Sequence, residues 1–242
     1  MAALTKVNNK TSLLWKPTPG KHHIRIVPYK FDMENPFIEL KFHYNVGGKT
    51  YLSPDTFNRP DPIVEFSNSL KKTGSKEDWL QGRKLEPKLR TYVPILVRGK
   101  EDEGVKFWGF GKKVYEEFLK IMSDPDEYGN ILDLEKGRDA IVEFTAAEAT
   151  GKSFPETTIR MKLTTSPAIE ESKKYLLENQ TKVTDIWPEL SYEDLKKVMQ
   201  ESLTTQSDEH PEDSSEENQE AGSISASTTE NVNEKLDKLF GK

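Results

Sequence analysis

Few residues in this chain of 242 have side chains that could carry out chemistry, because it has no cysteine and four histidines. The lack of cysteine excludes disulfides, thiolate nucleophiles and cysteine-based zinc or iron–sulfur sites. His22 and His23 are adjacent, so on a strand they face opposite ways and cannot hold one ion together. We therefore expect no metal and no other cofactor.

Two patterns resemble parts of enzyme sites. Residues 146–153, AAEATGKS, fit a loose phosphate-loop pattern in which Lys152 would serve a nucleotide hydrolase. A phosphate loop leads directly into a helix, but the residues that follow alternate like a strand, which favours a hairpin turn. Acidic pairs such as Asp124 and Asp126 could bind a nuclease metal, but no His or Lys nearby is arranged for acid–base work. We expect no catalytic activity.

A third pattern places basic and aromatic residues together on single strand faces. Because successive strand residues point to opposite faces, Lys106, Trp108 and Phe110 share one face, and Val105 and Phe107 share the other. Cations bind phosphates and exposed rings stack on unpaired bases, so the pattern indicates a site for single-stranded nucleic acid. The alternative is that the rings pack under a neighbouring helix. The candidate DNA-binding residues are Arg25, Tyr29, Lys88, Arg90, Tyr92, Lys106, Trp108, Phe110, Lys112 and Lys113.

Mostly short strands must position these residues. Alternating apolar and polar residues predict strands at 21–30, 36–46, 89–98, 105–112, 139–145 and 156–164. Gly47 and Gly48 predict a hairpin turn after the second of them. Short strands of mixed length, broken by small helices, favour a β-rich α+β fold with a small barrel and helical insertions.

Capping residues predict where several helices begin. Asp61 and Pro62 predict the N-cap and first residue of a helix that buries one apolar face, and residues 114–122 form a second helix. Ser191 and Asp194 form a capping box for the last helix of the body. No apolar run approaches the roughly 18 residues of a membrane span, and we expect no membrane partner.

Charge is distributed unevenly along the chain. Residues 1–122 carry a net charge of +8, whereas residues 123–203 and 204–242 each carry −7. A basic half can bind a polyanion although the whole chain is acidic. Residues 204–230 contain no Lys, Arg or aromatic residue, so we expect an acidic disordered tail. The tail ends in an apolar stripe at helical spacing that is a candidate partner-binding tip, formed by Leu236, Leu239 and Phe240 with Val232.

Four blocks in order carry a resemblance to a known family. They are HIRIVPYK from His23, NPFIELKFHYNVGGKTYL from Asn35, TYVPILV from Thr91 and KFWGFGKKVYEEFLKIM from Lys106. This series resembles the single-stranded DNA-binding, helix-destabilising proteins of T-even-like phages. The resemblance covers roughly residues 20–165, and the acidic tail agrees with it in composition.

The resemblance implies an OB-fold core that binds single-stranded DNA without sequence specificity in DNA replication, recombination and repair. It also implies that copies of the protein associate with one another on DNA and that the tail binds replication and recombination proteins. The expected location is the cytoplasm of an infected bacterial host. We accordingly divide the chain into an N-terminal arm (1–20), an OB-fold core with a helical subdomain (21–203) and the tail (204–242). The alternative from another class is an acidic protein–protein adaptor without nucleic-acid binding.

Two departures from that family matter. The family's type member holds zinc between a histidine and three cysteines, and His43 stands where that histidine would be, but no cysteine follows. We infer that ordinary packing replaces the metal, with Phe57, Ile63 and Phe66 as the packing residues. The family's N-terminal Lys/Arg cluster, which mediates self-association, is reduced here to Lys6 and Lys10 with neighbouring hydroxyl residues.

Overall fold

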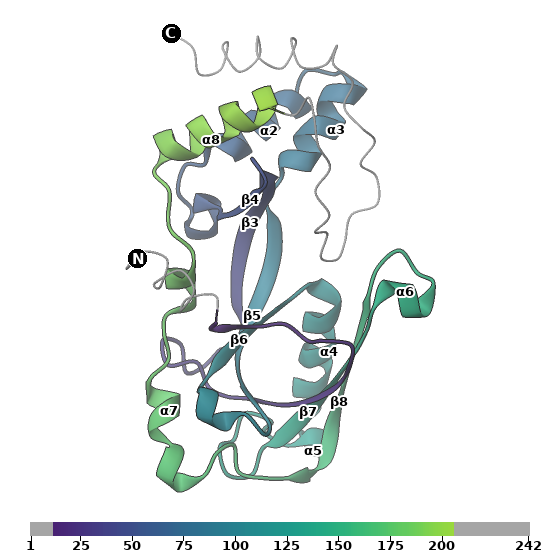
Figure 1. The fold of residues 1–242 in the computed structure, drawn as a ribbon, viewed down its shortest axis with the longest axis vertical. Helices are drawn as coiled ribbons and strands as arrows, with labels where there is room; N and C mark the ends of the chain where they lie inside the picture. The colour runs from purple at the N-terminus through teal and green to yellow at the C-terminus, as the bar shows by residue number, and fades with distance from the viewer. Residues whose placement is uncertain (1–11, 206–242) are drawn as a thin grey trace. The chain divides into compact units, whose positions relative to one another are not determined.

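The computed structural model describes residues 12–205, which form eight strands and seven α-helices (Figure 1). The strands are β1 (Leu14–Trp15), β2 (Gly20–Ile26), β3 (Ile38–Val46), β4 (Lys49–Leu52), β5 (Lys88–Val97), β6 (Lys106–Phe110), β7 (Arg138–Thr145) and β8 (Glu156–Thr165). The α-helices are α2 (Pro62–Lys71), α3 (Lys76–Leu85), α4 (Lys112–Met122), α5 (Pro125–Tyr128), α6 (Ala147–Thr150), α7 (Tyr175–Glu178) and α8 (Tyr192–Thr205). Among these residues no helix has the length and apolar character needed to cross a bilayer.

The described chain divides into two compact units. Unit 1 contains residues 12–39 and 90–186, and unit 2 contains residues 40–89 and 187–205. The chain enters unit 2 within β3, after Glu39, and returns to unit 1 within β5, at Arg90. The predicted acidic tail and its tip at Leu236, Leu239 and Phe240 lie outside the described residues.

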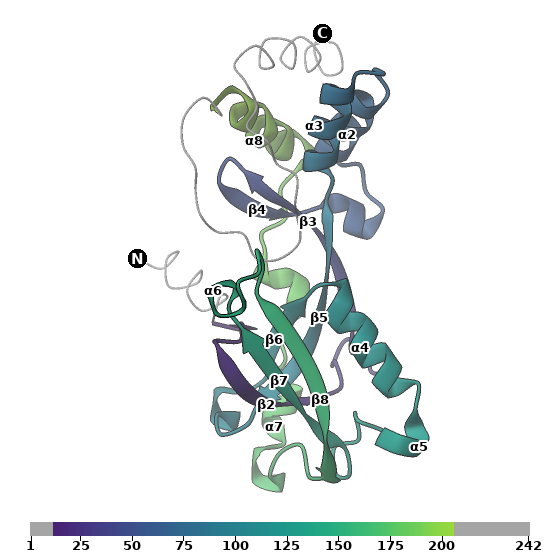
Figure 2. The ribbon, with the colours of Figure 1, turned by 90° about the vertical axis from the view of Figure 1, so that its right-hand side faces the viewer.

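Unit 1 is built on a mixed sheet with the strand order β1-β6-β5-β2-β7-β8. β1 pairs with β6 in parallel, and the other neighbours in this order are antiparallel. β7 and β8 form a long hairpin with α6 at its turn end (Figure 2), which confirms the hairpin prediction for residues 146–153. Because β8 follows this turn directly, Lys152 does not begin a phosphate-binding helix. In the described residues no hydrogen-bonded pair joins β1 to β8, so a closed OB-fold barrel stays a prediction.

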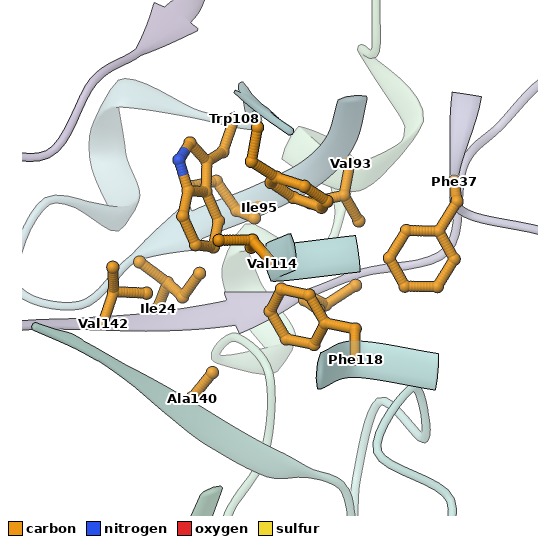
Figure 3. Close-up of a cluster of buried hydrophobic side chains, with 11 residues drawn as sticks. Ile24, Phe37, Val93, Ile95, Trp108, Val114, Phe118, Ala140 and Val142 are labelled. Atoms are coloured by element: carbon orange, nitrogen blue, oxygen red, sulfur yellow. The ribbon is translucent and has the colours of Figure 1, made fainter. Parts of the chain in front are cut away.

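One face of this sheet is covered by α4. Val114 and Phe118 of α4 are buried against Ile24, Val93 and Val142 of the sheet (Figure 3). The opposite face around β5 and β6 is covered by a second apolar cluster. This cluster consists of Val27, Leu96, Val105, Ala168 and Ile169. The central strands of unit 1 are therefore buried on both faces.

Unit 2 packs three helices around the β3–β4 hairpin. Gly47 and Gly48 form its turn with φ angles of 58° and 70°, the left-handed values that glycine adopts without strain. Asp61 is the N-cap of α2 as predicted, with its side chain accepting from the backbone N–H groups of Ile63 and Val64. The capping box of α8 is also confirmed, because Ser191 Oγ accepts from the Asp194 backbone N–H at 3.1 Å.

The buried core of unit 2 lies between α2, α8 and the hairpin. It consists of Val46, Ile63, Phe66, Leu70, Leu195, Met199 and Leu203. Two of the three predicted packing residues, Ile63 and Phe66, are fully buried here, and Phe57 is half-buried. Packing by these three residues is only part of the arrangement, because unit 2 also has a buried polar network around His43.

A buried charge cluster joins distant parts of unit 1. Asp139 of β7 accepts from Arg98 Nη2 at 2.6 Å, from Arg25 Nη1 at 3.3 Å and, on its other oxygen, from Lys162 Nζ at 3.1 Å. Burial raises the pKa of Asp139, but the hydrogen bonds and charges of Arg98 and Lys162 outweigh burial and leave the pKa below its ordinary value. The carboxylate therefore stays charged and holds three cations to the sheet.

We predict that Asp139→Asn destabilises the protein strongly, because it leaves the buried guanidinium of Arg25 without its charged partner. Removing one member of a buried ion pair costs about 3–5 kcal/mol, measured as the free energy of unfolding in urea. Glu143→Gln is the matched control, because Glu143 lies on the same strand and pairs with Lys21 while about half exposed. That surface pair is worth about 0–1 kcal/mol.

The same carboxylate predicts a pH dependence with a definite sign. A carboxyl whose pKa is lowered by folding stabilises the fold above its unfolded-state pKa of about 4, and this contribution disappears as the pH falls through the folded-state pKa. The stability difference between wild type and Asp139→Asn should therefore shrink below about pH 4. A difference that stays constant down to about pH 2 would contradict the assignment of Asp139 as the charged partner.

Candidate nucleic-acid interface

The two rings at the centre of the predicted interface are buried. Trp108 and Phe110 are 2% and 4% exposed, and their ring centroids lie 4.8 Å apart. Figure 3 shows the Trp108 ring in the cluster formed with Ile95, Val114 and Phe118. The prediction that these rings are exposed is wrong, and the alternative of packing under the neighbouring helix is what the structure has.

The cause of this error is that the central residues of β5 and β6 are buried on both faces of the sheet. Val93 and Ile95 lie in the buried cluster, and Trp108 shares their face because it pairs with Val93. Phe107, on the opposite face, is also buried and meets Tyr29 edge to face at 6.0 Å. Alternation separates two faces of a strand, but it does not show which face is solvated when both are covered.

Three further predicted residues are engaged inside unit 1. Arg25 is fully buried beside Asp139, and Tyr29 is 4% exposed, with its hydroxyl accepting from the Val183 backbone N–H at 3.1 Å. Burial raises the pKa of Tyr29. Lys106 donates to the Ser12 carbonyl at 2.9 Å, and its side chain is 14% exposed. The expected exposure of Arg25 and Tyr29 is therefore wrong, and Lys106 has a structural partner.

Tyr92 is also buried, at 9% exposure, and its position depends on Gly109. The two residues are cross-strand partners. A Cβ added at Gly109 would lie 2.5 Å from Tyr92 Cε1, so glycine is required for the ring to lie across β6. Gly109 therefore makes room for a ring of the protein itself.

The cations at the start of α4 remain exposed as predicted. The side chains of Lys112 and Lys113 are 80% and 63% exposed, and their ion pairs with Glu116 and Glu156 are long, at 3.6 and 3.8 Å. Gly111 is the N-cap and gives no side-chain cap, and the first turn has no acidic residue. The first backbone N–H groups of α4, which no side chain of the described residues caps, the helix dipole and two lysines together favour an anion such as a phosphate. Lys88 and Arg90 are half-buried, and their contact with DNA stays a prediction.

A basic and aromatic surface on α3 of unit 2 was missed by sequence reasoning. Trp79 is 42% exposed, and the Arg83 guanidinium lies 5.2 Å from its ring centroid. Lys72 and Lys76 are exposed nearby in the sequence, and neither makes an ion pair in the described part of the chain. We call Lys72, Lys76, Trp79 and Arg83 the α3 surface.

Helical geometry orients the α3 surface. Lys76, Trp79 and Arg83 are spaced three and four residues apart, which places them on one side of the helix. An adjacent side of the helix packs against α2, because a Cβ added at Gly82 would lie 2.7 Å from the Ser67 carbonyl oxygen. The spacing of Trp79 between Lys76 and Arg83 was the sequence signal that identifies this surface.

A shallow pocket of unit 2 offers little to a polyanion. Its volume is about 350 Å³, and its rim carries Arg59 and Glu189, which pair with each other at 3.1 Å. The rest of the lining is mostly apolar, from Leu52, Pro54, Phe57, Pro60, Leu190 and Tyr192. We therefore place no phosphate contact in it.

The metal site that the family resemblance implies does not fit the residues present. Residues 12–205 contain no cluster of three or more His, Asp, Glu or Cys side chains that could hold an ion. The resemblance puts His43 where the family's zinc-binding histidine would be, but the Nε2 atom of His43 is hydrogen bonded directly to Asp61 at 2.9 Å. No lone pair of this ring is directed at an ion site.

Two of these features are typical of nucleic-acid-binding proteins. One is the pair of exposed lysines at the start of α4, and the other is the Arg83 guanidinium over the exposed Trp79 ring. Comparison with protein families gives the more particular assignment. The family described as gp32 DNA binding protein like matches residues 18–207, and the chain belongs to that family. That family consists of non-enzymatic binding proteins. No curated protein sequence matches the chain.

We predict that Trp108 and Trp79 differ sharply in their effect on stability. Trp108→Ala should lower the free energy of unfolding by about 3–5 kcal/mol, because it leaves a large cavity in the core. Trp79→Ala should cost less than about 1 kcal/mol, because Trp79 is 42% exposed and belongs to none of the buried clusters described above. Urea unfolding followed by circular dichroism compares the two variants. Equal losses would contradict the assignment of Trp108 to the core and Trp79 to the surface.

Proposed function

We propose that the protein binds single-stranded DNA without sequence specificity and coats it. The observation that carries this proposal is the family match, which extends over residues 18–207 and so includes described parts of both units. The exposed cations of α4 and the α3 surface support it, because each offers what a single strand requires. A protein–protein adaptor has no comparable observation in its favour.

The proposed mechanism is capture of exposed bases and phosphates. Phosphates bind at the start of α4, where Lys112 and Lys113 adjoin the first N–H groups of the helix, and release condensed counterions. An unpaired base stacks on Trp79, and Arg83 adds a positive charge beside the ring. Every base has a flat face, so stacking of this kind tolerates any sequence. Duplex DNA hides those faces, and binding therefore favours the single strand.

The wider role follows from the family and stays part of the proposal. The protein would protect single strands during DNA replication, recombination and repair of a phage, in the cytoplasm of the infected bacterium. The tail tip at Leu236, Leu239 and Phe240 would bind replication and recombination proteins, and copies of the chain would associate along the DNA. The alternative in which the protein binds only other proteins is decided by the titration below.

We predict that oligo(dT) binds the full chain with an affinity that falls steeply with salt, because phosphate contacts release counterions. The double variant Lys112→Ala/Lys113→Ala should lower the slope of log affinity against log salt by about 1–2, since each lysine neutralises about one phosphate. Trp79→Ala should weaken binding about 5- to 150-fold, the loss of one stacked base. Fluorescence anisotropy of labelled oligo(dT) measures both effects.

Matched variants elsewhere on the surface control these effects. Lys100→Ala/Lys136→Ala removes two exposed lysines outside both proposed surfaces, and Tyr175→Ala removes a ring that is 57% exposed. Neither should change the affinity or its salt slope appreciably. If oligo(dT) does not bind the wild-type chain at low salt, the proposed function is wrong and the adaptor alternative is favoured.

A further inference from the structure

A buried histidine occupies the centre of unit 2. His43 lies on β3, is 1% exposed and has hydrogen-bond partners at both ring nitrogens. Its Nε2 atom lies 2.9 Å from Asp61 Oδ2, and its Nδ1 atom lies 3.1 Å from the Leu85 carbonyl oxygen. Leu85 is the last residue of α3, and Asp61 is the N-cap of α2. One imidazole ring therefore joins a strand to the ends of two helices.

The partners of this ring fix its protonation. A carbonyl oxygen only accepts hydrogen bonds, so Nδ1 must carry a proton to bind Leu85. Nε2 must also carry a proton if Asp61 is ionised, because a carboxylate only accepts. An imidazole with protons on both nitrogens is a cation.

Asp61 is held in its ionised form by four donors. Oδ1 accepts from the backbone N–H groups of Ile63 at 2.9 Å and Val64 at 3.2 Å. Oδ2 accepts from His43 at 2.9 Å and from the Ser53 hydroxyl at 2.5 Å. Burial raises the pKa of Asp61, but the hydrogen bond and charge of His43 with the other donors outweigh burial and leave the pKa below its ordinary value.

The two charges also match the helix ends that they contact. The amino end of a helix favours an anion and the carboxyl end favours a cation, because the backbone dipoles are aligned. Here the Asp61 carboxylate caps the amino end of α2, and the His43 ring donates to the carboxyl end of α3. The ion pair is thus stabilised at both members, which offsets part of the cost of burying it.

We propose that the buried pair of a cationic His43 and an anionic Asp61 is a positioning pair that takes the place of the zinc implied by the family resemblance. It fixes the carboxyl end of α3 against the amino end of α2 and so holds the α3 surface. Unit 2 then folds without a metal ion. The part of this inference that concerns DNA rests on the proposed function, whereas the protonation and the metal independence do not.

The direct test is ¹⁵N NMR of the histidine ring nitrogens in the full chain at pH 7 with a chelator present. We expect both nitrogens of His43 to show the shifts of N–H groups, with cross-peaks to slowly exchanging protons. We also expect the same melting temperature with and without the chelator. One unprotonated nitrogen on His43, or a large drop in melting temperature on chelation, would overturn the proposal.

Two variants test the positioning role. Asp61→Asn removes the negative charge while asparagine still caps α2, and Ser53→Ala is the control that removes one hydrogen bond to Asp61 but no charge. We expect Asp61→Asn to accelerate hydrogen exchange of α3 amides at least about tenfold more than Ser53→Ala does, with unit 1 amides unchanged. Equal effects of the two variants on α3 would overturn the positioning role.

Oligo(dT) titration of the same variants separates this inference from the proposed function. Asp61→Asn should weaken DNA binding at least about fivefold, because Trp79 would no longer be held in place to stack on a base. Faster exchange in α3 without weaker binding would leave the positioning pair in place and count against the α3 surface as a DNA site. Weaker binding with unchanged exchange would overturn the positioning pair.

Discussion

The burial of both faces of β5 and β6 is the constraint on which the rest of the structure depends. Trp108 and Phe110 pack under α4 on one face, and Phe107 and Val105 are buried on the other. Strands that carry the core in this way cannot also present flat rings to a ligand. Any base stacking by this chain must therefore use residues outside the central strands, and this directs attention to Trp79.

Local features of the fold were predictable because they depend on residues close in the sequence. Gly47 and Gly48 supply the left-handed turn of the β3–β4 hairpin, and Asp61 caps α2 through N–H groups two and three residues away. The exposure of Lys112 and Lys113 was also predicted, but Lys112 was expected to end a strand and instead begins α4. The pairing of β7 with β8 followed from alternation on both sides of a short turn.

Features that depend on distant partners were not predictable from one sequence. Arg25 alternates like a surface residue, but Asp139, 114 residues away, holds it inside unit 1. His43 looked like the remainder of a metal site, and its actual partner at Nδ1 is the carbonyl of Leu85, 42 residues away. The mistake at Trp108 has another origin, because α4, which covers this ring, is close to it in the sequence. Alternation did not show that both faces of the strand are covered.

The most direct test of this account uses two chains with one tryptophan each, the other three being replaced by phenylalanine. One chain keeps Trp79 and the other keeps Trp108, and each is titrated with oligo(dT) while its emission is recorded. The account predicts saturable quenching of Trp79 that added salt reverses, and nearly constant emission from Trp108. Strong quenching of Trp108 with no change at Trp79 would contradict it.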